Sequence, residues 1–426
     1  MKIFVALFAI SGSLSAQIDP DLKKRVDEDT RLQDVMSRAE TLIQTGLNAG
    51  SGYAEVWIRD LNTFIEPACK VVDTNKIRDA LLVFFKFQGD DGNIVDGYVT
   101  RTDDKISYDF RYSDLAPEFK AHKNTVETDQ ESSLIQAIAK YVRTTGDKSI
   151  LQEQIAGRSV EKRMNDALQF LLNERFNMEY GLIWGATTAD WGDVQPEHNW
   201  GVALDNNSHL CIDIYDNAMF AIAIRDFISL IDDTKNKIYW ENVHANITLN
   251  VRKHLWDSSK QKFIPHIYLN GSPFPANFDE SAVYYHGGTA IAIEADMLSK
   301  DEILASYRQM QRNVAAAGAN SIGLTVYPPY PEGFFLNPSM KPYGYQNGGD
   351  WCWFGARMVQ QLIAYGFYNE AYEALSPMID RVIEHNGFYE WWTLEGKPKG
   401  SGMFRGSAGT IWKAIKMMQE KSAIPR

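Results

Sequence analysis

The sequence predicts a mostly helical protein whose helices form two concentric rings. Apolar residues recur at the i, i+3, i+4 spacing of helices over most of the 426 residues. Some of these segments are apolar on nearly every side, as an inner layer requires, whereas others have a broad polar face. Short and long connections alternate between them. A closed double ring of roughly a dozen helices is the simplest arrangement that accommodates both features.

The expected helices are separated by Gly-rich or Pro-rich stretches. The segment 217–230, NAMFAIAIRDFISL, is the clearest inner helix, and 22–45 is the clearest outer one. A helical solenoid is the alternative, but the chain has no repeat of fixed short period. The helices are expected at 22–47, 76–87, 131–142, 160–176, 215–231, 238–256, 289–298, 301–315, 351–365, 368–384 and 407–421.

Composition indicates one ordinary globular domain over 17–426. With 45% hydrophobic and 23% charged residues, the chain can bury a large core, and no Pro-rich, Ser-rich or charged linker divides it. The formal net charge is -12 and no basic stripe is present. We therefore expect neither a nucleic-acid partner nor an anionic membrane surface. The oligomeric state is not predicted.

The first sixteen residues are typical of a secretory signal peptide. Met1-Lys2 is followed by an apolar run over 3–10 and by small residues through Ala16. A secreted or periplasmic protein is expected, and a buried first helix is the alternative. No later segment has the 18 or more uninterrupted apolar residues of a membrane span. We expect no membrane association once the signal is removed.

Several kinds of site are not indicated. Cys69, Cys211 and Cys352 are far apart and form no C-x-x-C pair, and the eight His residues form no H-E-x-x-H motif. We predict no disulfide framework, no metal and no cofactor, although one disulfide stays possible. G-x-S-x-G, Walker and G-x-G-x-x-G motifs are absent as well.

Three short stretches place a carboxylate beside tryptophan: 57–60 (WIRD), 189–193 (ADWGD) and 388–392 (FYEWW). Sugar sites need flat apolar faces for the ring and charged oxygens for the hydroxyls and the chemistry. Any one stretch is equally well explained by aromatic anchors and solvated acids. The three together indicate a carbohydrate pocket.

Three carboxyls are candidates for catalysis. Asp190 lies in a loop against Trp191, where lost hydration would raise its pKa and suit it to act as a general acid. Asp193 is a second candidate, and either could instead cap a helix. Glu390 lies among four aromatic residues, which suits a general base that activates water. An ion pair of Glu390 with Arg405 or a lysine is the alternative.

Other residues are candidates for substrate contact. Trp57, Arg59 and Asp60 combine a stacking surface, a forked donor and an acceptor, although Arg59 and Asp60 could form a structural ion pair. Asp350, in the aromatic segment 345–353, could instead cap a helix. The full expected set is Trp57, Arg59, Asp60, Asp129, Gln130, Trp191, Gln346, Asn347, Asp350, Trp351, Trp391 and Arg405.

Six motifs occur in a recognisable order: VWIRD at 56–60, ETDQES at 127–132, LIWGATTADWGD at 182–193, YDNAMF at 215–220, YQNGGDW at 345–351 and GFYEWW at 387–392. In this order the chain resembles the six-hairpin (α/α)6-toroid glycosidases. It most closely resembles glycoside hydrolase family 63, with its processing α-glucosidases and mannosylglycerate or glucosylglycerate hydrolases, and the trehalases. The resemblance implies an all-α (α/α)6 toroid with long aromatic-rich loops.

The resemblance also implies an activity. The expected enzyme is an inverting, exo-acting glycoside hydrolase of a small α-glucoside or oligosaccharide, with Asp190 matching the general acid and Glu390 the general base. This chain has GATTAD where the relatives carry an ESG-x-D loop, so Asp193 stays a rival acid. No cofactor is implied, and the partner is a carbohydrate substrate. The alternatives are a uronate-specific hydrolase, a polysaccharide lyase on the same toroid, or a noncatalytic carbohydrate-binding protein.

Overall fold

The computed structural model describes residues 18–103, 109–199 and 202–423. The predicted signal segment 1–16 lies outside this part of the chain. Within the described ranges, no helix is both long enough and apolar enough to cross a membrane.

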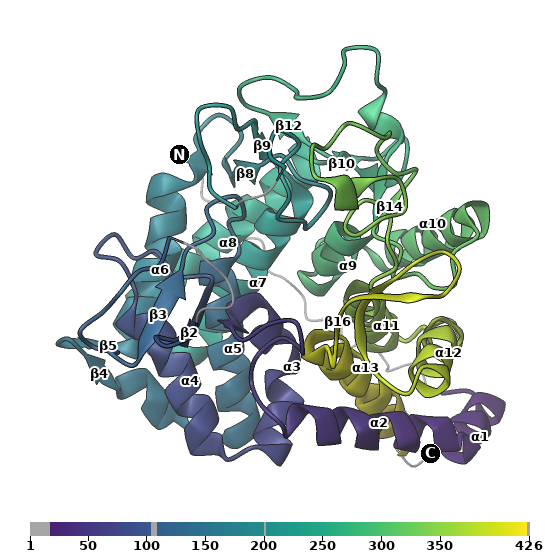
Figure 1. Cartoon of the computed structure of the whole chain (residues 1–426), viewed down its shortest axis with the longest axis horizontal. Helices are drawn as coiled ribbons and strands as arrows, with labels where there is room; N and C mark the ends of the chain where they lie inside the picture. The colour runs from purple at the N-terminus through teal and green to yellow at the C-terminus, as the bar shows by residue number, and fades with distance from the viewer. Residues whose placement is uncertain (1–17, 104–108, 200–201, 424–426) are drawn as a thin grey trace, which may run out of the picture.

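Six helices form a closed inner ring around the middle of the molecule (Figure 1). Each packs against the next one in the chain order of the ring, and the last packs against the first. Nearly every residue of the third member, α7, is buried, which confirms the predicted interior layer. The ring consists of α3 (Ile58–Val71), α5 (Gln130–Thr145), α7 (Ile214–Leu230), α9 (His286–Glu294), α11 (Cys352–Ala364) and α13 (Arg405–Ala423).

A second set of helices surrounds this ring. The helix α8 buries little more than Trp240, Ile247 and Val251, because only one of its faces packs against the inner layer. An additional helix, α1 (Pro20–Glu28), precedes the set and packs on α13. The outer helices are α2 (Thr30–Ile43), α4 (Thr74–Lys86), α6 (Val160–Glu174), α8 (Thr234–His254), α10 (Lys300–Ala317) and α12 (Tyr368–Glu384).

Two predictions about the helices were wrong. No helix is predicted at 58–71, whose first residues are predicted to contact the substrate, but the structure contains α3 there, and this helix continues through Pro67. The expected helix 22–47 is divided at Asp29, whose side chain accepts a hydrogen bond from the N–H of Arg31 and caps α2.

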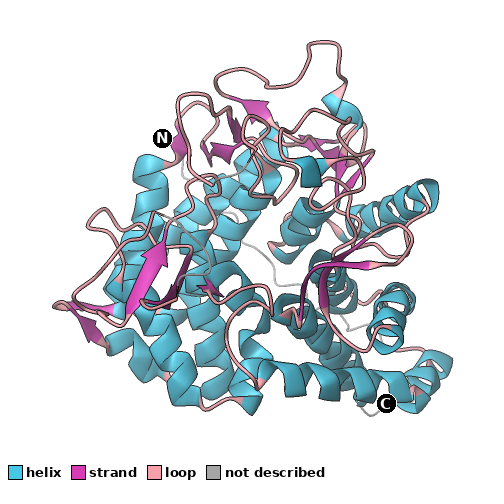
Figure 2. Cartoon of the chain, viewed as in Figure 1, coloured by secondary structure: helices cyan, strands magenta, loops and turns pink. Residues whose placement is uncertain are grey.

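The strands are short and lie almost entirely in the connections that lead into inner helices (Figure 2). Only β4 and β5, which follow α5, lie elsewhere. Since each inner helix is entered from this same kind of connection, the long loops gather where the inner helices begin. The strands are β1 (Val56–Trp57), β2 (Gly97–Thr100), β3 (Phe119–His122), β4 (Gln154–Ile155), β5 (Arg158–Ser159), β6 (Phe176–Asn177), β7 (Leu182–Ile183), β8 (Gly185–Ala186), β9 (Leu210–Ile212), β10 (Trp256–Asp257), β11 (Lys262–Phe263), β12 (Ile267–Tyr268), β13 (Tyr284–Tyr285), β14 (Val326–Tyr327), β15 (Tyr389–Trp392) and β16 (Pro398–Gly402).

These strands form small antiparallel sheets, among which β1-β2-β3 and β12-β9-β8 have three strands each. The predicted alternation of short and long connections is confirmed. For example, only 231–233 separates α7 from α8, whereas 175–213 leads from α6 into α7.

Candidate active site

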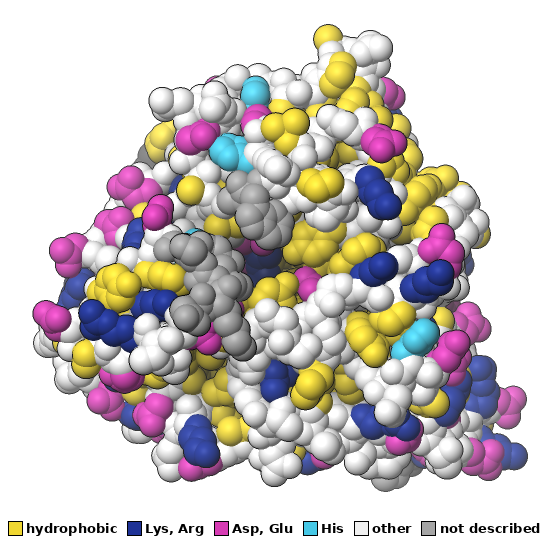
Figure 3. Space-filling model, viewed as in Figure 1, with side chains coloured by type: hydrophobic (Ala, Val, Ile, Leu, Met, Phe, Trp, Pro, Cys, Tyr) yellow, Lys and Arg dark blue, Asp and Glu magenta, His cyan; other side chains and the backbone are white. Residues whose placement is uncertain are grey.

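The face formed by the long loops is hollowed near its centre, with hydrophobic, acidic and basic side chains visible at the bottom (Figure 3). Segments far apart in sequence meet here. Tyr53, before α3, contacts Glu390 on β15, and Gln346, before α11, contacts Asp193 in the loop after β8. We call the site around Tyr53, Asp60, Asp193, Tyr345 and Glu390 the mouth pocket. Inner helices begin beside it, and the positive ends of their dipoles favour negatively charged groups there.

Glu390 is fixed in the pocket wall by two hydrogen bonds. The hydroxyl of Tyr53 donates to its Oε1 at 3.0 Å, and the N–H of Ser401 on the paired strand β16 donates to its Oε2 at 2.7 Å. The side chain is only 4% exposed and has no ion-pair partner among the described residues, so the alternative of an ion pair with Arg405 is not what the structure contains. Burial raises the pKa of Glu390 to about 7, and the charge of Asp193 adds to the rise.

Asp193 forms hydrogen bonds with both the nitrogen and the oxygen of the Gln346 side-chain amide. The Nε2 of Gln346 donates to Asp193 Oδ1 at 2.7 Å, and the backbone N–H of Asp193 donates to Gln346 Oε1 at 3.3 Å. The side chain is partly exposed, and its charge contributes to the raised pKa values of Asp60 and Glu390. The charge of Asp193 therefore acts on the two other acids of the mouth pocket.

Asp190 has a different environment. Its Oδ2 accepts from the N–H of Gly287 at 2.7 Å and its Oδ1 from the N–H of Gly288 at 2.8 Å, both in the first turn of α9. The residue at the N-cap position of α9, Tyr285, provides no side-chain cap, so Asp190 caps the helix from a distant loop. Asp190 is 1% exposed; burial raises its pKa and the two amide bonds oppose that rise.

The two glycines at the start of α9 make this cap possible. A Cβ on Gly287 would lie 2.3 Å from the ring of Trp191, and a Cβ on Gly288 would lie 2.6 Å from Ile214. Asp190 itself has a φ of 57°, a left-handed conformation that Asp tolerates better than most residues. The loop is thus folded around the Asp190 carboxylate, which directs Asp193 toward the pocket.

Arg59, which is predicted to contact the substrate, forms ion pairs with acidic residues of the protein itself. Arg59, in the first turn of α3, forms ion pairs with Glu127 and with Asp129, whose Oδ2 lies 2.8 Å from Arg59 Nε. Tyr215 donates to the same oxygen of Asp129 at 2.8 Å. The suggested ion pair between Arg59 and Asp60 is not formed. Asp60 instead has a buried Oδ1 to which none of the described residues donates a hydrogen bond, and burial raises the pKa of Asp60 to about 8.

The predicted tryptophans divide into two groups. Trp57 and Trp391 are partly exposed, and Trp391 lies edge-on to Tyr345 with ring centroids 6.3 Å apart. Trp191 and Trp351 are 2% exposed; their ring centroids are 4.7 Å apart, and Trp191 also stacks on Phe354. The first pair can present a face to a ligand, whereas the second pair anchors the loops to the inner ring.

Four other residues that are predicted to contact the substrate instead form hydrogen bonds to other parts of the protein. Gln130 accepts from Lys123, and the amide of Asn347 bonds to the backbone of the loop that contains Tyr330. Asp350 does not cap α11, whose N-cap residue is Trp351; instead it receives Arg381 and Ser321. Arg405 donates to Asn48 and Thr45. All four side chains are buried.

Sequence reasoning missed several residues of the pocket. Tyr53 and Tyr345 were not singled out, although the charges of Asp193 and Glu390 act on both. Asp96, just before β2, was also missed; its pKa is raised to about 7, chiefly by burial. Tyrosines in a Gly-rich loop or next to Gln-Asn are a weak signal, and the segment around Asp96 has no tryptophan.

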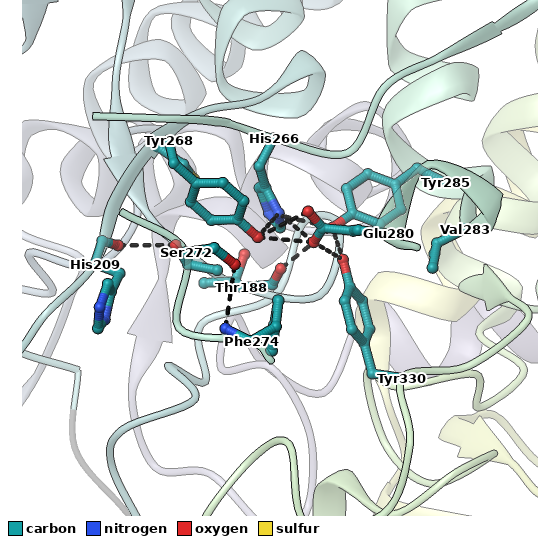
Figure 4. Close-up of polar contacts among 12 residues, drawn as sticks. Thr188, His209, His266, Tyr268, Ser272, Phe274, Glu280, Val283, Tyr285 and Tyr330 are labelled. Atoms are coloured by element: carbon teal, nitrogen blue, oxygen red, sulfur yellow. Dashed lines mark hydrogen bonds and ion pairs between the residues drawn. The ribbon is translucent and has the colours of Figure 1, made fainter. Parts of the chain in front are cut away.

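A buried polar network supports the loop that contains Asp190 and Asp193 (Figure 4). Glu280 accepts from Tyr268 and Tyr330 and lies 2.9 Å from Nδ1 of His266. Tyr285 lies 2.6 Å from the Tyr330 hydroxyl and donates to the carbonyl of Thr188, two residues before Asp190. The network therefore connects the loop to β12, β13 and the segment after β14.

The described cysteines are free, and the described residues include no group of three or more His, Cys, Asp or Glu placed to hold a metal ion.

No protein-family model and no curated protein sequence matches the chain. Solved structures do match. The GH63 mannosylglycerate hydrolase from Thermus thermophilus, in complex with glucose, aligns at TM-score 0.64 and 15% identity over 91% of this chain and 99% of that one. The same enzyme in complex with Tris aligns at TM-score 0.65 and 14% identity, over 89% and 99%. A rhamnosidase from Klebsiella oxytoca with rhamnose bound aligns at TM-score 0.60 and 12% identity, over 90% and 63%. These likenesses confirm the predicted (α/α)6 toroid fold.

Proposed function

We propose that the chain is an inverting, exo-acting glycoside hydrolase of a small α-glucoside or oligosaccharide, with Asp193 as general acid and Glu390 as general base. The observation that carries the proposal is the environment of Glu390. A buried carboxyl with a pKa near 7 and no cation beside it is costly to maintain, and it suits proton transfer at neutral pH. It shares the mouth pocket with a second, more exposed carboxyl, Asp193.

Asp193 fits the role of the acid better than Asp190. Both oxygens of Asp190 receive backbone N–H groups of α9, which is a structural use of a carboxylate. Asp193 keeps one oxygen bonded to Gln346 and has no described donor at the other, Oδ2. A general acid needs an oxygen that can present a proton to the substrate, and of the two aspartates only Asp193 has an oxygen without a described donor.

The proposed reaction needs no group besides these two. Glu390 removes a proton from a water molecule, whose oxygen attacks the anomeric carbon from the face opposite the leaving group. Asp193 donates its proton to the glycosidic oxygen as the C–O bond breaks, so the products are the free sugar and the alcohol. Protons exchanged with solvent then restore both carboxyls. Tyr53 and Ser401 fix the orientation of Glu390 during the proton transfer.

Substrate binding is assigned to the exposed polar and aromatic groups. The Asp60 side chain is partly exposed and its carboxyl can accept a hydrogen bond from a sugar hydroxyl, and Trp57 or Trp391 can stack on the ring. The uronate-specific alternatives need a cation for the sugar carboxylate. Arg59 does not meet this need, because Glu127 and Asp129 already neutralise it. The structural neighbours, a mannosylglycerate hydrolase and a rhamnosidase, agree with a glycosidase function.

Two conservative variants test this assignment. Asp193→Asn and Glu390→Gln should each lose hydrolysis of responsive α-glucosides by at least about 100-fold, while calorimetry shows that sugar binding is retained. Asp190→Asn provides the matched control for the acid. Full activity of Asp193→Asn would refute its role, and absence of turnover with every glycoside by the unmodified protein would favour a carbohydrate-binding protein.

A further inference from the structure

Asp96 is a carboxylate at the edge of the mouth pocket for which the reaction above has no use. Its backbone is fixed at both sides: its carbonyl accepts from the N–H of Ile58 at 2.9 Å, and its N–H donates to the carbonyl of His122 at 2.8 Å. The first contact places it at the beginning of α3, next to the turn that contains Arg59 and Asp60. The side chain is 15% exposed, so a ligand can reach it.

The Asp96 carboxylate receives no hydrogen bond from any residue in the described ranges. The nearest basic group is Nδ1 of His122, at 4.0 Å, and burial lowers the pKa of this histidine to about 4, so that it is neutral near pH 7. A partly buried carboxylate without donors can accept hydrogen bonds from the hydroxyl groups of a sugar.

The groups around Asp96 include more acids than unshared cations. Asp60, Asp193 and Glu390 are the other acids of the pocket, and the charges of Asp129 and Asp193 contribute to the raised pKa of Asp96. Arg59 is the cation that acts on Asp96 most strongly, but it is shared with Glu127 and Asp129. The pocket therefore keeps a surplus of negative charge when its acids ionise.

We infer that Asp96 is a specificity residue that selects neutral glycosides: its carboxylate binds hydroxyl groups of the substrate and repels substrates that carry a carboxylate or a phosphate. This inference rests on the proposed hydrolase function and adds a substrate class to it. It separates this chain from its structural neighbour, the mannosylglycerate hydrolase, because mannosylglycerate is the glycoside of an acid. One like charge acting across a partly wet pocket changes affinity by about tenfold.

A matched pair of substrates tests the inference. Glucosylglycerol and glucosylglycerate share the sugar and the linkage and differ by a hydroxymethyl group in place of a carboxylate. The unmodified protein at pH 8 should hydrolyse the glycerol compound with at least tenfold higher kcat/KM. Asp96→Asn should reduce this preference by about tenfold, mainly by improving the glycerate compound. Asp90→Asn, which removes an exposed charge from the turn before β2, should leave the ratio unchanged.

A preference for glucosylglycerate, or an unchanged ratio in Asp96→Asn, would overturn the inference. Calorimetry of the same two compounds with Glu390→Gln provides a readout without turnover. Glu390→Gln should bind the glycerol compound more tightly than the glycerate compound, and the double variant Glu390→Gln/Asp96→Asn should lose or reverse this preference. That result supports the inference even if hydrolysis is absent and the proposed function fails. Equal binding, or no binding of either compound, contradicts it.

Discussion

Replacing Glu390 by Gln should make the protein more stable at alkaline pH and no more stable at acidic pH. The folded state holds the Glu390 proton with a pKa of about 7, above the ordinary value of 4.5. Between these values the folded state binds more protons than the unfolded state, so stability falls as pH rises from 4.5 to 7, and the full loss is present above pH 7. The difference corresponds to about 3 kcal/mol.

A Gln at position 390 resembles the protonated Glu side chain, so the variant does not undergo the loss of folding stability that ionisation of Glu390 causes. For a chain of this size, about 3 kcal/mol corresponds to an increase in Tm of roughly 3 °C. Calorimetric scans at pH 8.5 and pH 5 should show that increase only at pH 8.5. Glu179→Gln, at an exposed position in the turn between β6 and β7, is the matched control and should have no effect at either pH. A lower Tm of Glu390→Gln at pH 8.5, or the same change at both pH values, would refute the reasoning.

Three further predictions concern the loop and the pH profile. Asp190→Asn turns an amide N–H toward one of the two N–H donors of α9, so the free energy of unfolding should fall by about 1 to 3 kcal/mol. Asp193→Asn should instead lose activity at a nearly unchanged Tm. Loss of activity at unchanged Tm in Asp190→Asn, with loss of stability in Asp193→Asn, would make Asp190 the acid and Asp193 the structural residue. The rate at low substrate should rise with pH through a midpoint near 7 as Glu390 ionises, and a flat profile from pH 5 to 8 would contradict its role as base. Tyr53→Phe removes a hydrogen bond that lowers the pKa of Glu390, so that midpoint should move to higher pH; a shift to lower pH would be inconsistent with the bond.

The double ring could be predicted because its cause is local. An inner helix such as 214–230 must be apolar on nearly all sides, and the alternation of short and long connections is readable from the sequence. The helix 58–71 could not be found in this way. Its Pro67 interrupts the pattern, and its helical state depends on packing against α5 and α13, which lie far away in sequence.

The candidate site was predictable only in part. The aromatic signal indicated Glu390 and the loop of Asp190 and Asp193, and it placed Asp190 ahead of Asp193 as the acid, whereas the hydrogen bonds of the two carboxyls favour Asp193. The hydrogen-bond donors of Asp190 are backbone N–H groups about a hundred residues further along the chain, and no side-chain pattern in the sequence indicates them. Asp96 has no tryptophan near it in sequence, so only the arrangement of β1, β2 and β3 brings it to the pocket.

Time-resolved proton NMR of the products tests the central claim most directly. The protein would be mixed with α- and β-linked glucosides, mannosides and trehalose, and the anomer released first would be followed. We expect prompt release of the β-anomer from an α-glucoside, and no release by Asp193→Asn. Initial release of the α-anomer would contradict the inverting mechanism, and unchanged release by Asp193→Asn would contradict the assignment of the acid.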